Sequence, residues 1–196
     1  MTKVLLDLSV SLDGYATGPD VSPEEPMGHG GEALHDWMFA GRSAAEAQSF
    51  MTDQFAGIGA VISGRRTADL GIGHWGEEPV FHAPVFVVTT RPAETIVKKG
   101  GTSYAFVTEG IEEALARARD AAGTQDIRIN GGADIARQYL YGAAVQELRL
   151  HLVPVILGGG GRLFDGGLPA HIRLEPRAAT STPLATHLTY EVTAKG

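Results

Sequence analysis

The residues best suited to bind an anion follow a short apolar stretch late in the chain. Ile127 and Ile129 alternate with polar residues, which predicts a strand, and Gly131-Gly132 comes directly after it. Apolar residues then recur at helical spacing between Ile135 and Leu140. A glycine turn between a strand and a helix lets a ligand approach bare backbone, and a helix N-terminus favours negative charge. The pattern indicates a phosphate site, with an ordinary tight turn as the alternative.

Two other predicted strands end in residues that suit a phosphate. The apolar stretch 59–64 is followed by Arg65-Arg66-Thr67, and the strand predicted over 84–92 ends in Thr89-Thr90-Arg91 before Pro92. Ligands of open α/β sheets bind at the carboxyl ends of the strands, and arginine makes charge-assisted, bidentate bonds to phosphate. We therefore expect the three strand ends to share one edge of the sheet. For each arginine taken alone, a solvated surface charge is the alternative.

The remaining candidate groups give weaker signals. Asp13 precedes Gly14 and is typical of a turn, while Asp36 is either a helix-surface charge or a proton relay. The seven histidines form no H-E-x-x-H motif and the chain has no cysteine, so we expect no metal site and no disulfide. The stretch 71–76 matches G-x-G-x-x-G, but it neither follows a predicted strand nor opens a helix.

Length and charge exclude several classes of protein. A chain of 196 residues suits a single domain, which we place over residues 1–196. The formal net charge of -7 argues against nucleic acid as a partner, because phosphate backbones need basic surfaces. The N-terminus does not resemble a signal peptide, and the apolar runs are shorter than the roughly 20 residues that a membrane helix needs. We expect a cytoplasmic protein that does not enter membranes.

Strand patterns and helix patterns alternate through the first three quarters of the chain, which predicts an α/β fold with a mainly parallel sheet. A loop is expected over 17–31, helices over 34–39, 43–55 and 111–122, and a strand over 148–157. Ser43 and Glu46 have the spacing of a capping box at the start of the second helix. The last two predicted strands, 172–179 and 188–192, have no helix between them and indicate an antiparallel hairpin.

The ordered set of motifs resembles the dihydrofolate reductase superfamily. It resembles more closely the stand-alone relatives of the reductase domain of the bifunctional riboflavin-biosynthesis deaminase–reductase. The matching stretches are Val61–Thr67, Val87–Pro92 and Asn130–Gly132, together with Ser11–Gly14, Val153–Gly160 and Leu163-Phe164. The resemblance extends from about Val4 to Val192.

This resemblance implies a three-layer fold with a mostly parallel, eight-stranded sheet and a C-terminal antiparallel hairpin. It also implies NADPH as the cofactor, a homodimer, and a cis peptide bond between Gly131 and Gly132. Carried over by position, the cofactor-binding residues would be Ser9, Ala16 and Thr17 beside the nicotinamide; Gly64, Arg65, Arg66 and Thr67 at the pyrophosphate and adenosine; Thr89, Thr90 and Arg91 at the adenine and 2′-phosphate; and Gly131, Gly132, Ala133, Asp134 and Ile135 at the pyrophosphate and nicotinamide ribose.

The resemblance implies a reductase that transfers hydride from NADPH to a small heterocyclic, carbonyl or imine substrate. The activity it favours is 5-amino-6-(5-phosphoribosylamino)uracil reductase, with dihydrofolate reductase as the runner-up and a nucleotide-binding module without turnover as the alternative of another class. Asp36 is nearest to the position of the pteridine-binding carboxylate and is the catalytic candidate. The loop Pro19–Gly31 is acidic, which suits a ribose phosphate poorly. NADPH is preferred over NADH because arginines suit a 2′-phosphate and no acidic residue is expected at a 2′-hydroxyl.

Overall fold

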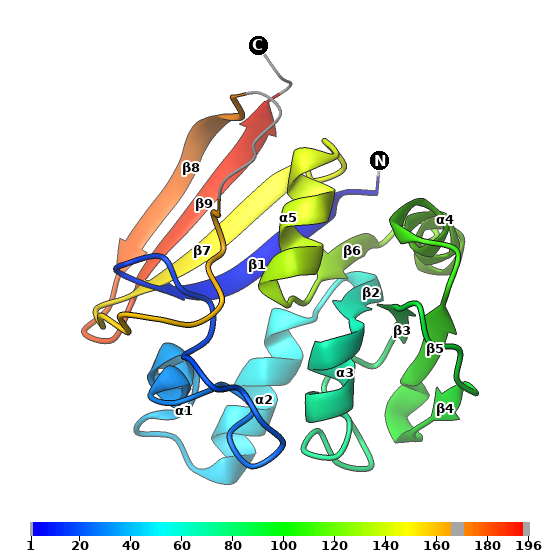
Figure 1. The fold of residues 1–196 in the computed structure, drawn as a ribbon, viewed down its shortest axis with the longest axis horizontal. Coiled ribbons are helices and arrows are strands. Elements are labelled where there is room, and N and C mark those ends of the chain that lie inside the picture. Colours follow the sequence, from blue (N-terminus) through cyan, green and yellow to red (C-terminus); the bar gives the residue numbers. More distant parts are fainter. Residues whose placement is uncertain (1, 166–170, 194–196) are drawn as a thin grey trace.

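The computed structural model describes residues 2–165 and 171–193, which form one nine-stranded sheet flanked by helices (Figure 1). The strand order is β4-β5-β3-β2-β6-β1-β7-β9-β8. The strands are β1 (Val4–Ser11), β2 (Ile58–Gly64), β3 (Pro84–Val88), β4 (Ile96–Val97), β5 (Ser103–Val107), β6 (Asp126–Ile129), β7 (Glu147–Val153), β8 (Arg173–Ser181) and β9 (Thr186–Thr193). The α-helices are α1 (Asp36–Phe39), α2 (Ala44–Gln54), α3 (Arg65–Gly71), α4 (Ile111–Ala122) and α5 (Ala133–Tyr141), and 3-10 turns cover Gly31–His35 and Lys99–Gly101.

The directions of the strands confirm the predicted mixed sheet. The pairs β1–β6, β1–β7, β2–β3, β2–β6 and β3–β5 are parallel, whereas β7–β9 and β8–β9 form the antiparallel C-terminal part. The sequence predicted eight strands over this region, and the ninth in the described residues is β4. It consists of two exposed residues that pair antiparallel with β5, and so short a segment carries no periodicity that could predict it.

Helices cover both faces of the sheet and divide its core into layers. Val4 and Leu6 of β1 pack in a cluster with residues of α4 and α5. Leu5 points to the opposite face, where it packs with Phe55 after α2 and Ala68 of α3. Alternate residues point to opposite faces of a strand, so β1 is apolar on both of them over its first half.

Two boundaries show how local chemistry sets the elements. The backbone N–H of Ser43 donates to the Glu46 carboxylate at 2.7 Å, and the Glu46 N–H donates to Ser43 Oγ at 3.4 Å. This confirms the predicted capping box, and α2 begins at Ala44. Strand β7 ends at Val153 instead of Leu157, because Pro154 has no N–H and Val155 bonds back to the Val153 carbonyl.

Strand β8 forms one edge of the sheet, and all nine of its residues are exposed. Its pairing with β9 shifts register between Pro176 and Ala178. Within the described residues, no helix is long and apolar enough to cross a membrane.

Candidate functional site

Three of the predicted anion-binding segments follow neighbouring strands. Strands β3, β2 and β6 lie side by side and run parallel, so their carboxyl ends meet at one edge (Figure 1). Gly64 ends β2, Thr89 follows β3, and Asn130 follows β6. The structure therefore confirms that these three strand ends share an edge of the sheet.

The glycines at this edge allow two helix starts to lie close together. The Gly64 N–H donates to the Gly131 carbonyl at 3.0 Å, and the peptide bond from Gly131 to Gly132 is cis, as the resemblance implied. A Cβ atom on Gly132 would lie 3.2 Å from Thr67 Oγ1, and one on Gly64 would lie 2.9 Å from Ile135 Cγ1. Side chains at these two glycines would therefore push α3 and α5 apart.

Arg65 and Arg91 come together on one side of this edge, and a carboxylate lies between them. Asp69 Oδ1 is 2.6 Å from Arg65 Nε, and Asp69 Oδ2 is 2.8 Å from Arg91 Nη2. Arg65 also donates from Nη1 to the Arg91 carbonyl at 3.0 Å. No acidic residue was expected here from the sequence, but Asp69 lies one helical turn after Arg65 and is such a residue.

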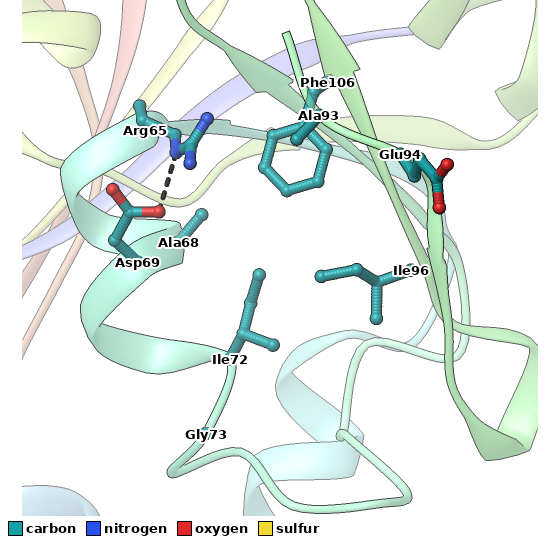
Figure 2. A pocket seen from close by; sticks show the side chains of 9 residues that line it. All are labelled: Arg65, Ala68, Asp69, Ile72, Gly73, Ala93, Glu94, Ile96 and Phe106. Carbon is teal, nitrogen blue, oxygen red and sulfur yellow. Dashed lines mark hydrogen bonds and ion pairs between the residues drawn. The ribbon is translucent and has the colours of Figure 1, made fainter. Parts of the chain in front are cut away.

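Arg65 and Asp69 line a cavity of about 300 Å³. Its wall is mainly apolar and includes one aromatic ring, as Figure 2 shows; the lining residues are Arg65, Ala68, Asp69, Ile72, Gly73, Ala93, Glu94, Ile96 and Phe106. The Arg65 guanidinium carbon is 4.9 Å from the centre of the Phe106 ring. A flat aromatic ligand with an attached anionic group matches this combination of an aromatic wall and Arg65, with Arg91 next to it across Asp69.

Two of the other predicted residues on these strand ends make contacts within the protein. Arg66 donates from Nη2 to the Val21 carbonyl at 3.0 Å, so it holds the loop before α1 against α3. Thr89 Oγ1 accepts the Arg91 N–H at 3.0 Å and fixes the turn after β3. Thr90 is exposed. On α5, Ala133 and Asp134 form the first turn, and Asp134 pairs with Arg137.

The predicted nicotinamide neighbours lie at the carboxyl end of β1. Ser9 is buried, and its Oγ accepts the indole N–H of Trp37 at 3.0 Å. Thr17 Oγ1 accepts the Gly161 N–H at 3.1 Å, and the Ala16 N–H donates to the Gly161 carbonyl at 2.8 Å. The glycine-rich segment after β7 therefore packs directly against these residues.

Asp13 fixes the turn next to them, as its Asp-Gly sequence predicted. Its carboxylate accepts bonds from Ser11 Oγ at 2.6 Å and from the Leu157 and Gly158 N–H groups at 3.1 and 2.8 Å. The Ser11 hydrogen bond and these backbone bonds lower the pKa of Asp13 to about 2.

Asp36 and its neighbour Trp37 point in different directions. Asp36 is exposed at the start of α1, whereas Trp37 is buried against the sheet. The Trp37 ring lies 4.2 Å from the centre of the His151 ring and 4.8 Å from that of His187. The polar side chains that lie against Trp37 are therefore His151 of β7 and His187 of β9.

This polar group, which no sequence motif predicted, consists of Asp7, Arg128, His151 and His187. Asp7 Oδ1 is 2.9 Å from His151 Nε2 and 3.2 Å from Arg128 Nη2, and the two histidines share a hydrogen bond of 2.7 Å between their Nδ1 atoms. The four residues lie on the neighbouring strands β6, β1, β7 and β9. The one signal in the sequence for this group was Asp7, a charged residue in the middle of a mainly apolar strand.

Burial and mutual contact shift the acid–base properties of this group. Burial alone would raise the pKa of Asp7, but the Arg128 charge and the His151 hydrogen bond bring it below its ordinary value. Burial, followed by the charge of His151, lowers the pKa of His187. His35 lies nearby, and burial together with the His151 charge lowers its pKa from 6.5 to about 4.

Comparison with known proteins decides the family. Residues 2–188 match the model of the RibD C-terminal domain. The chain belongs to the RibD C-terminal domain family. It is 27% identical over 176 residues to the protein YyaP of Bacillus subtilis (strain 168), a match that covers 83% of this chain and 80% of YyaP.

Solved structures share the fold. A protein of Shewanella sp. PV-4 named for riboflavin biosynthesis superimposes with a TM-score of 0.69 at 20% identity, over 99% of this chain and all of that one. Dihydrofolate reductase from Enterococcus faecalis, solved in complex with NADP(H), superimposes with a TM-score of 0.58 at 15% identity, over 98% of this chain and 97% of the enzyme. The predicted dihydrofolate-reductase-like fold is therefore confirmed.

Proposed function

We propose that this protein is an NADPH-dependent reductase that transfers hydride to a C=N or C=O group of a small heterocycle. The observation that carries the proposal is the shared edge of β3, β2 and β6, where Arg65 lines a cavity with an aromatic wall and Arg91 is joined to it through Asp69. Family membership supports the same reaction class, since the reductase domain of riboflavin biosynthesis has this fold.

The residues at this edge fit an adenine dinucleotide phosphate. Arg65 and Arg91 would bind the 2′-phosphate, and the Phe106 ring would line the adenine site. The pyrophosphate would lie at the N-terminus of α5, which Gly64 and Gly132 allow to approach α3 closely.

The reaction would take place at the carboxyl end of β1. When bound there, NADPH supplies a hydride from its nicotinamide ring, and the protein orients the substrate and excludes water. Ser9, Ala16 and Thr17 would lie beside the nicotinamide, held by their contacts to Trp37 and Gly161. Asp36 is the proposed proton donor from the protein surface.

The proposed substrate is 5-amino-6-(5-phosphoribosylamino)uracil or a related pyrimidine. The loop before α1 carries Asp20, Glu24 and Glu25, which would repel a ribose phosphate that approached over this loop. The reaction should therefore be tried with the substrate and with its dephosphorylated form, and a preference for the latter would point to an uncharged ribose or ribitol group.

The test is consumption of NADPH by the purified protein with these pyrimidines and, separately, with dihydrofolate. We expect turnover with a pyrimidine and little with dihydrofolate, because the inward position on α1 is occupied by Trp37 in place of a carboxylate. Faster turnover of dihydrofolate would replace the proposal with a dihydrofolate reductase. Tight NADPH binding without turnover of any substrate would favour a nucleotide-binding module.

We further propose a homodimer. Strand β7 carries Leu148, Leu150 and Leu152 at alternate positions, and at the edge of the sheet beyond it all nine residues of β8 are exposed (Figure 1). Light scattering at micromolar concentration should give about twice the chain mass of 20.7 kDa. A mass equal to that of one chain would contradict the dimer.

A further inference from the structure

Asp69 occupies the two arginines that the proposed cofactor needs. Its carboxylate oxygens go to different partners, one to Arg65 Nε at 2.6 Å and the other to Arg91 Nη2 at 2.8 Å. Figure 2 shows the Asp69 carboxylate on the Arg65 side of the cavity, facing the space that Phe106 borders. A phosphate that bound both arginines would have to share them with this carboxylate and would lie close to its negative charge.

Solvent access makes these contacts easy to exchange. The exposed fraction of the side chain is 41% for Asp69, 23% for Arg65 and 66% for Arg91. Exposed ion pairs contribute little to the stability of a fold because water and salt screen them. The carboxylate can therefore leave Arg91 without disturbing the packing of α3.

A 2′-phosphate and a 2′-hydroxyl make opposite demands on this carboxylate. A phosphate monoester is strongly negative near neutral pH and has three acceptor oxygens, so it competes with Asp69 for the guanidinium donors and is repelled by the carboxylate. A hydroxyl can instead donate a hydrogen bond to a carboxylate, as ribose does in sites that bind NAD. Asp69 thus disfavours the phosphate form and can accept the hydroxyl form.

We propose that Asp69 is a specificity-determining residue that competes with the 2′-phosphate for Arg65 and Arg91 and so narrows the preference for NADPH over NADH. The inference rests on the proposed function, because it places the adenosine end of the cofactor in the cavity beside α3. The inference adds that the wild-type pocket admits both NADPH and NADH. Without Asp69, the two arginines would favour NADPH over NADH more strongly.

The experiment measures dissociation constants of NADPH, NADH, adenosine 2′-monophosphate and adenosine at one ionic strength for the wild type and for Asp69→Asn. Loss of the competing charge should raise the affinity for NADPH and for adenosine 2′-monophosphate by about tenfold and should not raise the affinity for NADH. Because Asp69 is exposed, the variant should fold, which its thermal midpoint will verify.

Glu113→Gln is the matched control. Glu113 pairs with Arg117 at the same i,i+4 spacing and with similar exposure, 43% and 40%, but on α4, outside the cavity. Glu113→Gln removes the same net charge as Asp69→Asn. An equal gain of NADPH affinity in this control would therefore assign the effect to long-range electrostatics and overturn the proposal.

The outcomes separate the inference from the proposed function. A lower affinity of Asp69→Asn for NADPH, or an unchanged NADPH-to-NADH ratio, would overturn the role of Asp69 even if the protein is a reductase. A gain in affinity for NADPH and adenosine 2′-monophosphate without turnover of any substrate would support the role of Asp69 and reject the reductase. If the wild type binds none of the four probes, both the role of Asp69 and the proposed reductase are overturned.

Discussion

Two carboxylates in this protein each lie between two basic side chains, but they differ in their access to water. Asp7 contacts Arg128 and His151 across neighbouring strands of the sheet. The exposed fractions of these three side chains are 3%, 10% and 11%. Breaking such a group leaves an uncompensated charge in a medium that solvates it poorly.

Asp69 has the same kind of partners in the opposite setting. Its contacts to Arg65 and Arg91 are as short as those of Asp7, yet all three side chains reach solvent. The comparison shows that contact distance alone does not tell a structural ion pair from an exchangeable one. Desolvation makes the difference: breaking the Asp7 group leaves a buried charge without a partner, while the Asp69 group remains available to a ligand.

The largest effect is expected from breaking the buried group. Replacing Asp7 by Ala leaves Arg128 buried without its counter-charge and should lower the free energy of unfolding by about 3–5 kcal/mol. Asp69→Ala should change it by less than about 1 kcal/mol. Urea unfolding of both variants measures the difference, and equal losses would refute the distinction between the two groups.

The next effect concerns cofactor affinity. Arg91→Ala removes a charge-assisted contact worth about 1.5–3 kcal/mol, so NADPH should bind roughly ten- to a hundredfold more weakly. Arg91 is 66% exposed, and its loss should leave unfolding unchanged. Titration of NADPH and NADH into this variant and into Arg117→Ala, whose arginine lies on α4, provides the measurement and its control. Unaltered NADPH binding in Arg91→Ala would remove this arginine from the proposed site.

The smallest effect is a loss of stability in acid, which is expected from His35 near the buried Asp7 group. The pKa of His35 is lowered from 6.5 to about 4 in the folded protein. Between these two values the unfolded chain binds the proton and the folded chain does not, so stability falls as the pH is lowered through this window. The loss from His35 should be on the order of 1–2 kcal/mol after allowance for partial exposure.

Other groups act on His35 and shape the same profile. The His151 charge reinforces the shift, and the Asp36 carboxylate opposes it. The lowered pKa values of His187 and Asp7 give losses of the same sign, with that of Asp7 confined to pH below its ordinary value of 3.8. Urea unfolding between pH 7 and pH 4 measures how far the free energy of unfolding falls with pH. The fall should be smaller for His35→Gln than for the exposed control His74→Gln, and equal falls would exclude His35 as the source.

The parts of the fold that the sequence predicted are those set by local chemistry. The strand, glycine turn and helix around Gly131-Gly132 are written in adjacent residues, as is the capping box of Ser43 and Glu46. The shared edge of three strand ends followed from the general rule that parallel strands present their carboxyl ends together.

The features that the sequence did not predict depend on the order of the strands in the sheet or on which side of a helix faces the core. His151 and His187 meet only because β7 and β9 are neighbours, and Asp7 meets Arg128 only because β1 lies beside β6. Asp69 joins Arg91 across 22 residues of sequence. On the short helix α1, a rotation of one residue decides that Trp37 is buried and Asp36 is exposed, and four residues are too few for a pattern to fix that phase.

The outer edge of the sheet has a consequence for how copies of the chain can meet. Open edge strands can pair with edges of other molecules, and proline and bulges oppose such pairing. Strand β8 carries both, since Pro176 lacks an N–H and the register shifts before Ala178. Growth of the sheet by edge-to-edge addition is therefore disfavoured at β8, and the proposed dimer would form across a face of the hairpin instead.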